Sequence, residues 1–296
     1  MRNYNTLNDF LVWAESAFNE AGLYFGHGTN NAWDEAVQIA RFVLGLPINA
    51  KASLLKRKLT TAEAKQLKKL AETRIQKRIP VPYLCHEAYF AGLPFYVDER
   101  VIIPRSPLAE VIEAGFQPFL GKRKVTAILD LCTGSACIAI ACALRFKGAT
   151  VDAIDISKPA LTVATKNVKA FNLQNRVHLK RSNLFEGLSG QTYDIIISNP
   201  PYVSEKTFNA LPPEYHFEPA LSLVAGKQGL DLVRRILNSA LAHLKPGGIL
   251  IVEVGEAERA LIKAYPKLPF TWLSFEHGGE GVFLLKKEND FCWQTS

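Results

Sequence analysis

Three short stretches place polar side chains beside residues that tighten or stiffen the backbone. They are DLCTGSA at 130–136, AIDIS at 153–157 and ISNPPYV at 197–203. In the third stretch a hydrophobic run leads straight into Asn199, two prolines and Tyr202. Proline lacks a backbone donor and has a fixed φ, so Pro200 and Pro201 must end the strand before them. The pattern predicts a rigid turn that presents an amide side chain, a free carbonyl and a ring.

The first two stretches are typical of a cofactor site. Thr133, Gly134 and Ser135 predict a tight strand-to-helix turn whose backbone can approach a ligand closely. Asp130, just before this turn, can meet a cation or a hydroxyl. Asp155, at the next strand end, can accept both hydroxyls of a ribose; the alternative is that it caps the following helix. The turn lacks the G-x-G-x-x-G pattern of nicotinamide enzymes, so we predict an adenosine-type cofactor, which S-adenosylmethionine fits.

The proline-rich turn is suited to hold a planar NH2 group. The side-chain oxygen of Asn199 and the carbonyl of Pro200 can both accept from one such group, and Tyr202 can pack on its plane. An amide nitrogen is a poor nucleophile while its lone pair is delocalised, so an enzyme that methylates it must aim it at the methyl group. We therefore interpret Asn199, Pro200 and Tyr202 as catalytic candidates, with an ordinary strand-ending turn as the alternative.

The second half of the chain has the pattern of an α/β sheet. Short apolar runs alternate with helical stretches. The expected strands are VTAILDL, TVDAIDIS, RVHLKRS, YDIIISN, GGILIVEVG, TWLSFEH and GVFLLKK. This order predicts a doubly wound, mostly parallel sheet with an antiparallel hairpin of the last two strands at one edge. Ligands of such sheets bind at the carboxyl ends of the strands, where the three polar stretches lie.

The first 80 residues have apolar residues at helical spacing. We expect helices over 10–21 and 33–44, and a third that begins at the capping box Thr60 to Glu63. RIPVPYL at 78–84 breaks the period, and the residues around Gly92-Leu93-Pro94 alternate like a hairpin. The expected domains are a helical, substrate-recognition domain at 1–80, a linker and hairpin at 81–104 and a cofactor-binding domain at 105–296.

Composition indicates a soluble globular protein. Of 296 residues, 48% are hydrophobic and 21% are charged, and no apolar run approaches the roughly 20 residues needed to span a bilayer. Acidic residues interrupt the first apolar stretch, which is unlike a secretory signal, so a cytoplasmic location is expected. The five cysteines lack paired C-x-x-C spacing, so we expect reduced thiols and no metal site. The oligomeric state stays open.

The formal charge of +7 is concentrated in one segment, which we call the basic stretch, residues 51–78. Its basic residues are Lys51, Lys56, Arg57, Lys58, Lys65, Lys68, Lys69, Arg74, Lys77 and Arg78. Only Glu63 and Glu72 oppose them. Such a stretch favours a polyanionic partner such as RNA, or a substrate bound to RNA, although a solvated helix face is the alternative.

The polar stretches resemble a known family. DLCTGSACIAIA, AIDIS, RSNLFEGL and SNPPYV are similar to class I S-adenosylmethionine-dependent methyltransferases that modify planar NH2 nitrogens, and specifically to protein-glutamine methyltransferases of the HemK/PrmB group. LPFYVDERVIIPRSPLAEVI, LPPEYHFEPALSLVAGKQGLDLVRRIL and FTWLSFEHGGEGVFLLKK resemble the branch that acts on the third large-subunit ribosomal protein. The release-factor branch typically has IPRPDTE where residues 103–110 read IPRSPLAE. The resemblance covers nearly the whole chain.

The resemblance implies a Rossmann-like sheet of seven strands and a role for each stretch. It implies that residues 132–136 line the methionine moiety, Asp155 holds the ribose and residues 183–184 flank the adenine. The implied cofactor-binding residues are Asp130, Cys132, Thr133, Gly134, Ser135, Ala136, Asp155, Asn183, Leu184 and Asn199. The substrate-binding candidates are Asn199, Pro200, Pro201, Tyr202 and Arg105.

Two positions depart from the family pattern. The family usually has glycine where Ala136 stands and aspartate where Asn183 stands. A methyl group at Ala136 crowds the cofactor if its backbone has a positive φ, and an amide at Asn183 donates as well as accepts. We expect cofactor binding to persist in weakened form.

Three alternatives stay open at this point. One is a nucleic-acid methyltransferase that acts on an exocyclic base amine, which poses the same geometric problem. A second is the same glutamine chemistry on peptide-chain release factors. A third is a cofactor-blind scaffold that binds a ribosome precursor. The expected partner is a large-subunit ribosomal protein, free or in a precursor particle.

Overall fold

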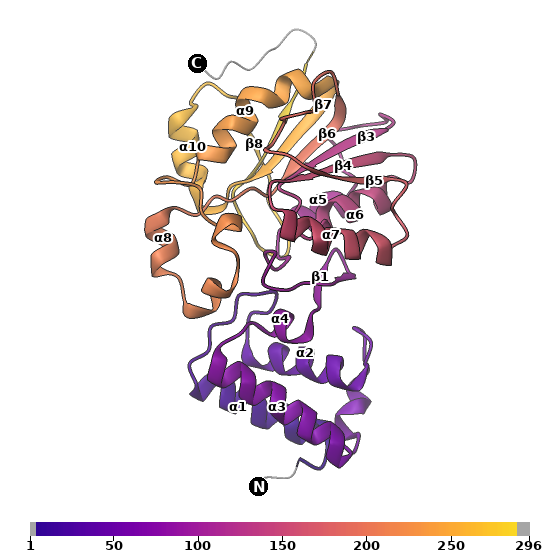
Figure 1. The fold of residues 1–296 in the computed structure, drawn as a ribbon, viewed down its shortest axis with the longest axis vertical. Coiled ribbons are helices and arrows are strands. Elements are labelled where there is room, and N and C mark those ends of the chain that lie inside the picture. The colour runs from indigo at the N-terminus through magenta and orange to yellow at the C-terminus, as the bar shows by residue number, and fades with distance from the viewer. Residues whose placement is uncertain (1–3, 289–296) are drawn as a thin grey trace. The chain divides into compact units, whose positions relative to one another are not determined.

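The computed structural model describes residues 4–288 and divides the chain into two compact units (Figure 1). The first unit holds the chain up to Ala88 together with Pro212–Phe217, and the second holds Tyr89–Leu211 and the chain from Glu218 onward. The division differs from the predicted domains at two places. The expected linker begins as a short helix of the first unit, and the first unit recruits six residues from far along the chain.

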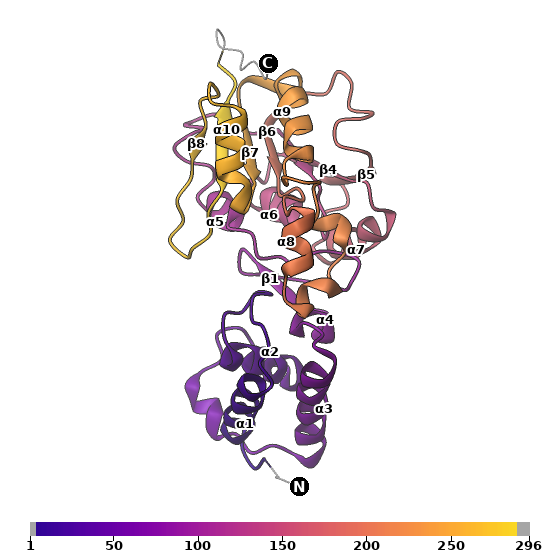
Figure 2. The ribbon, with the colours of Figure 1, turned by 90° about the vertical axis from the view of Figure 1, so that its left-hand side faces the viewer.

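The first unit is helical, as predicted. Its elements are α1 (Leu7–Glu20), α2 (Ala32–Leu44), η1 (Ala52–Lys56), α3 (Thr61–Lys77), α4 (Val81–Cys85) and η2 (Pro213–Phe217). Thr60 caps α3 through a complete capping box with Glu63, and α2 ends at Gly45 in the left-handed conformation. Figure 2 shows α1, α2 and α3 packed together, and their apolar faces form one core around Phe10, Ile39 and Leu67.

The basic stretch is not wholly on the surface, which corrects the sequence interpretation. Arg74 is fully buried, and its guanidinium pairs with Glu35 at 2.9 Å and with Glu214 at 3.3 Å. Arg78 also pairs with Glu214, at 3.0 Å. These bonds incorporate the segment around Glu214 into the first unit. Helical periodicity placed Arg74 on the outer face because a buried ion pair with a residue 140 positions away leaves no local signal.

The second unit contains the predicted seven-stranded sheet. The strands are β3 (Ala127–Leu131), β4 (Thr150–Asp155), β5 (Val177–Arg181), β6 (Tyr193–Ser198), β7 (Leu244–Glu253), β8 (Thr271–Trp272) and β9 (Val282–Lys286). Their order in the sheet is β5-β4-β3-β6-β7-β9-β8, and the last two pair antiparallel at the edge. β1 (Ala88–Phe90) and β2 (Leu93–Phe95) form the separate hairpin that the sequence predicted.

Helices cover both faces of this sheet. The helices of the second unit are α5 (Leu108–Glu113), α6 (Cys137–Arg145), α7 (Lys158–Ala170), α8 (Glu205–Ala210), η3 (Ala220–Ser222), α9 (Asp231–His243), η4 (Gly255–Ala257) and α10 (Glu258–Ala264), of which α8 and η3 bury no residue. Successive residues of a strand point to opposite faces, so Ile195 and Ile197 of β6 pack with α5, α6 and α7, while Ile196 packs with α9 and α10 (Figures 1 and 2). This explains why the strands read as continuous apolar runs.

The register of the sheet brings the three polar stretches together. Leu131 of β3 is paired with Ile154 of β4 and with Ser198 of β6. The residues that follow these three positions are Cys132, Asp155 and Asn199. They therefore emerge side by side at the carboxyl edge of the sheet, as the sequence predicted.

Several global expectations can be compared with the structure. The described helices include none long and apolar enough to cross a membrane. Cys85, Cys137 and Cys142 are buried and Cys132 is half-buried, all as free thiols, while Cys292 lies outside the described residues. Between residues 4 and 288, no group of three or more His, Cys, Asp or Glu side chains is arranged to hold a metal ion.

Candidate functional site

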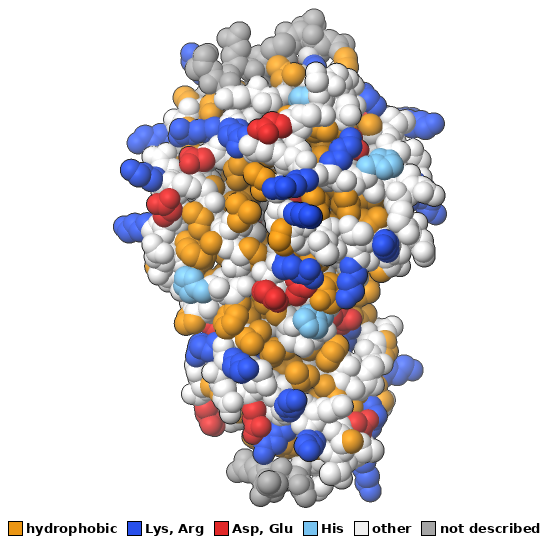
Figure 3. All heavy atoms as spheres, in the orientation of Figure 1, with side chains coloured by type: hydrophobic (Ala, Val, Ile, Leu, Met, Phe, Trp, Pro, Cys, Tyr) orange, Lys and Arg blue, Asp and Glu red, His pale blue; other side chains and the backbone are white. Residues whose placement is uncertain are grey.

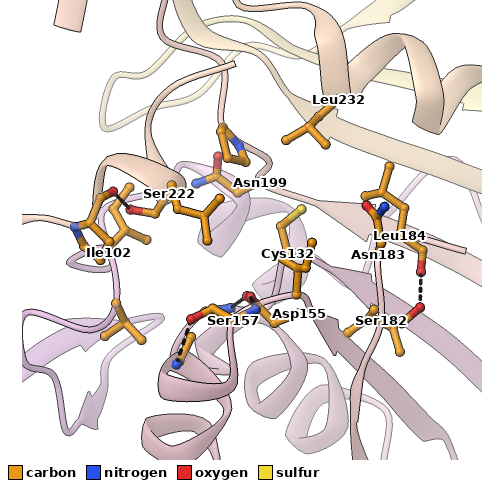
Figure 4. A pocket seen from close by; sticks show the side chains of 18 of the residues that line it. Ile102, Cys132, Asp155, Ser157, Ser182, Asn183, Leu184, Asn199, Ser222 and Leu232 are labelled. Atoms are coloured by element: carbon orange, nitrogen blue, oxygen red, sulfur yellow. Dashed lines mark hydrogen bonds between the residues drawn. The ribbon is translucent and has the colours of Figure 1, made fainter. Parts of the chain in front are cut away.

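A cavity of about 330 Å³ opens at the carboxyl ends of β3, β4, β5 and β6 (Figure 4). Seven of the predicted site residues line it: Cys132, Gly134, Asp155, Asn183, Leu184, Asn199 and Pro201. Seven others do not line this cavity: Arg105, Asp130, Thr133, Ser135, Ala136, Pro200 and Tyr202. The volume is in the range of small-molecule sites. The sequence therefore located the cavity, whereas some of its predicted residues support it from behind.

Asp155 joins the ends of two strands. One carboxylate oxygen accepts from the backbone N–H of Gly134 at 2.9 Å and the other from that of Ser157 at 2.8 Å. Ser157, not Asp155, is the N-cap of α7, because its hydroxyl accepts from Ala160. Burial raises the pKa of Asp155, although its backbone hydrogen bonds oppose this shift. Each oxygen keeps a lone pair for a further donor, which suits a pair of ribose hydroxyls.

Asn183 is held by two charged neighbours. Its side-chain oxygen accepts from the Arg235 guanidinium at 2.9 Å, and its NH2 group donates to Glu186 at 2.8 Å. An aspartate here would keep the first bond but would face Glu186 with a second negative charge. The departure from the family pattern at this position therefore matches its surroundings. Figure 4 shows Asn183 and Leu184 on one side of the cavity and Ile102 on the other.

Two residues that line the cavity, and one in the core behind it, have left-handed backbone conformations. Cys132 has φ 59°, Ala136 has φ 65° and Leu184 has φ 55°, all sparsely populated by residues other than glycine. Such strain persists only where the surroundings enforce it, and it clusters at functional sites. Ala136 has the positive φ on which the predicted crowding of the cofactor depends, and its side chain is buried in the core and does not line the cavity.

Asp130 supports the glycine turn from inside the protein. Its side chain is fully buried, and one carboxylate oxygen accepts from the hydroxyl of Thr133. Burial raises the pKa of Asp130 to about 7, with the Thr133 hydrogen bond acting in the opposite direction. Asp130 thus acts on the cavity through the turn that it holds.

The proline-rich turn follows β6 and enters the cavity wall through Asn199 and Pro201. Ser198, the last residue of β6, donates its hydroxyl to the Leu131 carbonyl at 2.8 Å, which fixes where the turn begins. Figure 4 shows no hydrogen bond between the Asn199 side chain and the other residues drawn. Its amide is thus available to a ligand in the cavity. Tyr202 instead donates its hydroxyl to Glu253 at 2.8 Å.

Arg105, a predicted substrate ligand, has its guanidinium occupied. It forms two bonds with the carboxylate of Glu218, at 2.6 Å and 2.8 Å, and one with the Ile103 carbonyl at 3.1 Å. The buried Glu218 also accepts from the backbone N–H of Ile103 at 2.9 Å. This arrangement fixes the segment that carries Ile102 to the cavity wall.

Sequence reasoning missed much of the apolar wall and two arginines. The missed lining residues are Arg100, Val101, Ile102, Ile154, Ile156, Ser157, Ala160, Ser182, Pro219, Leu221, Ser222, Leu232 and Arg235. Those near 100 and 220 fall within stretches that carried the family resemblance. Arg235 lies on α9, whose amphipathic pattern gave no sign of a ligand.

The residues present fit S-adenosylmethionine. Asp155 supplies acceptors for a ribose, Leu184 and Leu232 supply apolar surfaces for a planar ring, and Asn199 adds an amide to the cavity wall. A sheet of this order, with such a cavity at the carboxyl ends of its strands, defines a class I S-adenosylmethionine-dependent methyltransferase. The Methyltransferase small domain family model matches residues 116–212, in agreement with this class.

Characterised relatives cover almost the whole chain. It is 44% identical over 286 residues to a ribosomal protein uL3 glutamine methyltransferase from Francisella tularensis, covering 96% of this chain and 91% of the relative. It is 47% identical over 282 residues to the enzyme of the same name from Xanthomonas campestris, covering 95% and 91%. The chain belongs to the family of ribosomal protein uL3 glutamine methyltransferases.

Solved structures agree on the fold alone. The catalytic domain of hMettl16, solved in complex with an RNA hairpin of the MAT2A 3′UTR, aligns with a TM-score of 0.53 at 17% identity and covers 86% of this chain and 92% of that one. A second complex of the same domain gives a TM-score of 0.52. At this identity the likeness shows a shared fold and gives no information about the substrate.

Proposed function

We propose that this enzyme transfers the methyl group of S-adenosylmethionine to the side-chain amide nitrogen of a glutamine in ribosomal protein uL3. The observation that carries the proposal is the place of Asn199: it lines a cofactor-sized cavity immediately before two prolines that stiffen the turn, and its amide makes no hydrogen bond to the other residues drawn in Figure 4. An amide acceptor there can bind one N–H of a glutamine and aim the nitrogen into the cavity. The activity named for the two relatives supports this substrate.

The protein's contribution to the reaction is positioning. When bound, the cofactor supplies an electrophilic methyl group on a sulfonium. Transfer would form a bond between the amide nitrogen and the methyl carbon as the sulfur–carbon bond breaks, and the nitrogen would lose one proton to water. Asn199, with the Pro200 carbonyl, holds the NH2 group, so that its lone pair faces the methyl group. Tyr202 does not line the cavity and holds the end of this turn through the bond of its hydroxyl to Glu253.

The test is methyl transfer with three purified acceptors. Tritiated S-adenosylmethionine is supplied with unmodified uL3, with a peptide-chain release factor and with naked ribosomal RNA, and the product is located by peptide mass spectrometry. We expect a single added methyl on one glutamine of uL3. Label on the release factor alone would show that the enzyme has the substrate of the release-factor branch. Label on RNA alone would show that it methylates a base amine. Cofactor binding without any transfer would point to the scaffold alternative.

We propose that the helical unit recruits the substrate in the cytoplasm while uL3 is associated with RNA. Lys65 and Lys69 are exposed, and Lys68, half-buried, pairs with Glu72 at 3.5 Å. Figure 3 shows Lys and Arg among Asp and Glu side chains on the visible face of this unit, so the net charge is dispersed. An electrostatic contribution to binding should decrease with salt.

Replacement of Lys65, Lys68 and Lys69 by Glu tests this role. We expect a higher KM for precursor particles and a weaker salt dependence, with kcat nearly unchanged. Glutamates at the exposed Lys122 and Lys124 of the second unit serve as a charge-matched control. Equal KM values for both variants at low salt would mean that the basic stretch is a solvated helix face without a role in substrate binding.

A further inference from the structure

A buried carboxylate lies directly behind the proline-rich turn. Ser198 of β6 is paired with Val252 of β7, so Glu253 at the end of β7 is the neighbour of Asn199 across the sheet. The Glu253 side chain is 5% exposed and does not line the cavity. A buried acid of this kind is costly unless its oxygens are satisfied, so its partners indicate its role.

Both oxygens of Glu253 accept hydrogen bonds from hydroxyl groups. Oε1 accepts from the Tyr202 hydroxyl at 2.8 Å, and Oε2 accepts from the Ser106 hydroxyl. Hydrogen bonds to an ionised acceptor are about twice as strong as neutral ones. Burial raises the pKa of Glu253, while the two hydroxyls and the nearby charge of Arg105 favour its ionised form. The carboxylate therefore links the turn to the segment that precedes α5.

Two glycines hold Tyr202 at other points. A side chain at Gly255 would place its first carbon 2.7 Å from the Tyr202 ring, and one at Gly229 would place it 2.0 Å from the Tyr202 carbonyl oxygen. Both distances are shorter than any ordinary contact, so the backbone at each glycine lies against Tyr202. With its hydroxyl bonded to Glu253, Tyr202 is fixed at its ring, its backbone and its tip.

We propose that Glu253 is a positioning residue for methyl transfer, which fixes the proline-rich turn through Tyr202 and is itself held by Ser106. This inference rests on the proposed function, because it assigns the turn to substrate binding. Glu253 contacts neither cofactor nor substrate, and its effect reaches the reacting nitrogen only through Tyr202. Removing the carboxylate charge leaves the cavity intact but loosens the turn.

The kinetic test compares Glu253→Gln, Tyr202→Phe and the double variant. We expect Glu253→Gln to lower kcat about tenfold, the scale of one hydrogen bond to a charged group, with the cofactor Kd within about twofold of wild type. Because Glu253 acts through the Tyr202 hydroxyl, its removal should add little once that hydroxyl is gone. The kcat of the double variant should therefore stay within about twofold of the kcat of Tyr202→Phe. Glu256→Gln, the same change at an exposed acid three residues later, is the matched control.

A readout without substrate separates this inference from the proposed function. Tyrosine labelled with ¹³C at Cζ gives a resonance for Tyr202, assigned by its loss in Tyr202→Phe. We expect this resonance to shift or broaden in Glu253→Gln and to stay in place in Glu256→Gln, whichever acceptor the enzyme methylates. If Glu253→Gln does not fold, Ser106→Ala replaces it, with an expected loss of about threefold in kcat that is not additive with Tyr202→Phe.

Three results would overturn the inference. They are an unmoved Tyr202 resonance, fully multiplicative losses in the double variant, and a loss of cofactor affinity as large as the loss in kcat. Failure of uL3 methylation by the wild-type enzyme, with the resonance shift present, would instead count against the proposed function alone.

Discussion

The two ends of strand β6 place polar side chains in opposite situations. Near its start, Asp194 is buried and satisfied: Lys245 donates to it at 2.8 Å, Arg123 at 3.2 Å, and the backbone N–H of Thr126 at 2.9 Å. Just past its other end, Asn199 makes no hydrogen bond to the residues around the cavity drawn in Figure 4. The Asp194 side chain therefore bonds to other parts of the protein, whereas the Asn199 amide is available to a ligand.

The difference also appears in the pKa values. Burial alone would raise the pKa of Asp194, but hydrogen bonds from Lys245, Thr126 and Ala127 lower it to about 2. At the carboxyl ends of β4 and β7, burial prevails and raises the pKa of Asp155 and Glu253. In this sheet the acid that accepts from charged donors stabilises the fold, and the acids that accept only from backbone N–H and hydroxyl groups lie at the site.

Among substitutions that test the difference between the two ends of β6, Asn199→Ala should have the largest effect. We expect kcat on uL3 to fall about a hundredfold or more, the scale for removal of one preorganised polar partner, with cofactor affinity nearly intact. Asn199→Asp should also be slow, because it loses the NH2 donor and adds a charge. Stopped-flow methyl transfer and calorimetry measure the two quantities. Near-normal turnover in either variant would return the turn to a purely structural role.

Asp155→Ala should affect binding instead of turnover. Loss of an acceptor for the ribose hydroxyls is expected to weaken cofactor affinity by about 1.5 to 3 kcal/mol, the range for hydrogen bonds to a charged group. Asp155 also holds the Gly134 backbone at 2.9 Å, so circular dichroism must confirm the fold. Unchanged calorimetric affinity in a folded variant would mean that this carboxylate only ties two strand ends together.

Asp194→Asn should affect stability and leave kcat and KM unchanged. We expect a loss of about 1 to 2 kcal/mol at pH 7, after allowance for the half-buried lysine and arginine partners. The pKa of Asp194 in the folded protein is about 2, below the ordinary aspartate value of 3.8. Stability from Asp194 is thus fully present above the unfolded pKa and is lost as the pH falls through the folded one.

Urea unfolding from pH 7 to pH 3 measures this effect. The stability difference between wild type and Asp194→Asn should narrow below about pH 4, where the unfolded state takes up the proton. A constant difference across this range would show that packing, not charge, makes Asp194 important.

Sequence periodicity and local chemistry were sufficient for the elements and for the edge of the sheet that binds ligand. The strands were evident because both of their faces are buried, and the capping box at Thr60 began α3 as predicted. What could not be predicted depends on contacts between distant segments. The Tyr202 to Glu253 bond and the Arg74 to Glu214 pair join residues 51 and 140 positions apart, and neither has a local pattern.

The smallest expected effect is at Ala136, where the family pattern and the structure disagree about the consequence of a methyl group. Its left-handed backbone, φ 65°, costs an alanine about 1 kcal/mol relative to glycine, whereas burial of the methyl group returns about 0.8 kcal/mol. Because the two contributions nearly cancel, Ala136→Gly should change the free energy of unfolding by less than about 1 kcal/mol. Since the side chain does not line the cavity, cofactor affinity should also stay within about twofold. Calorimetry and urea unfolding of the same preparation measure both. A marked gain in affinity would show that the methyl group does reach the cofactor, and that residue 136 belongs with Asn199 among the positions kept for a ligand.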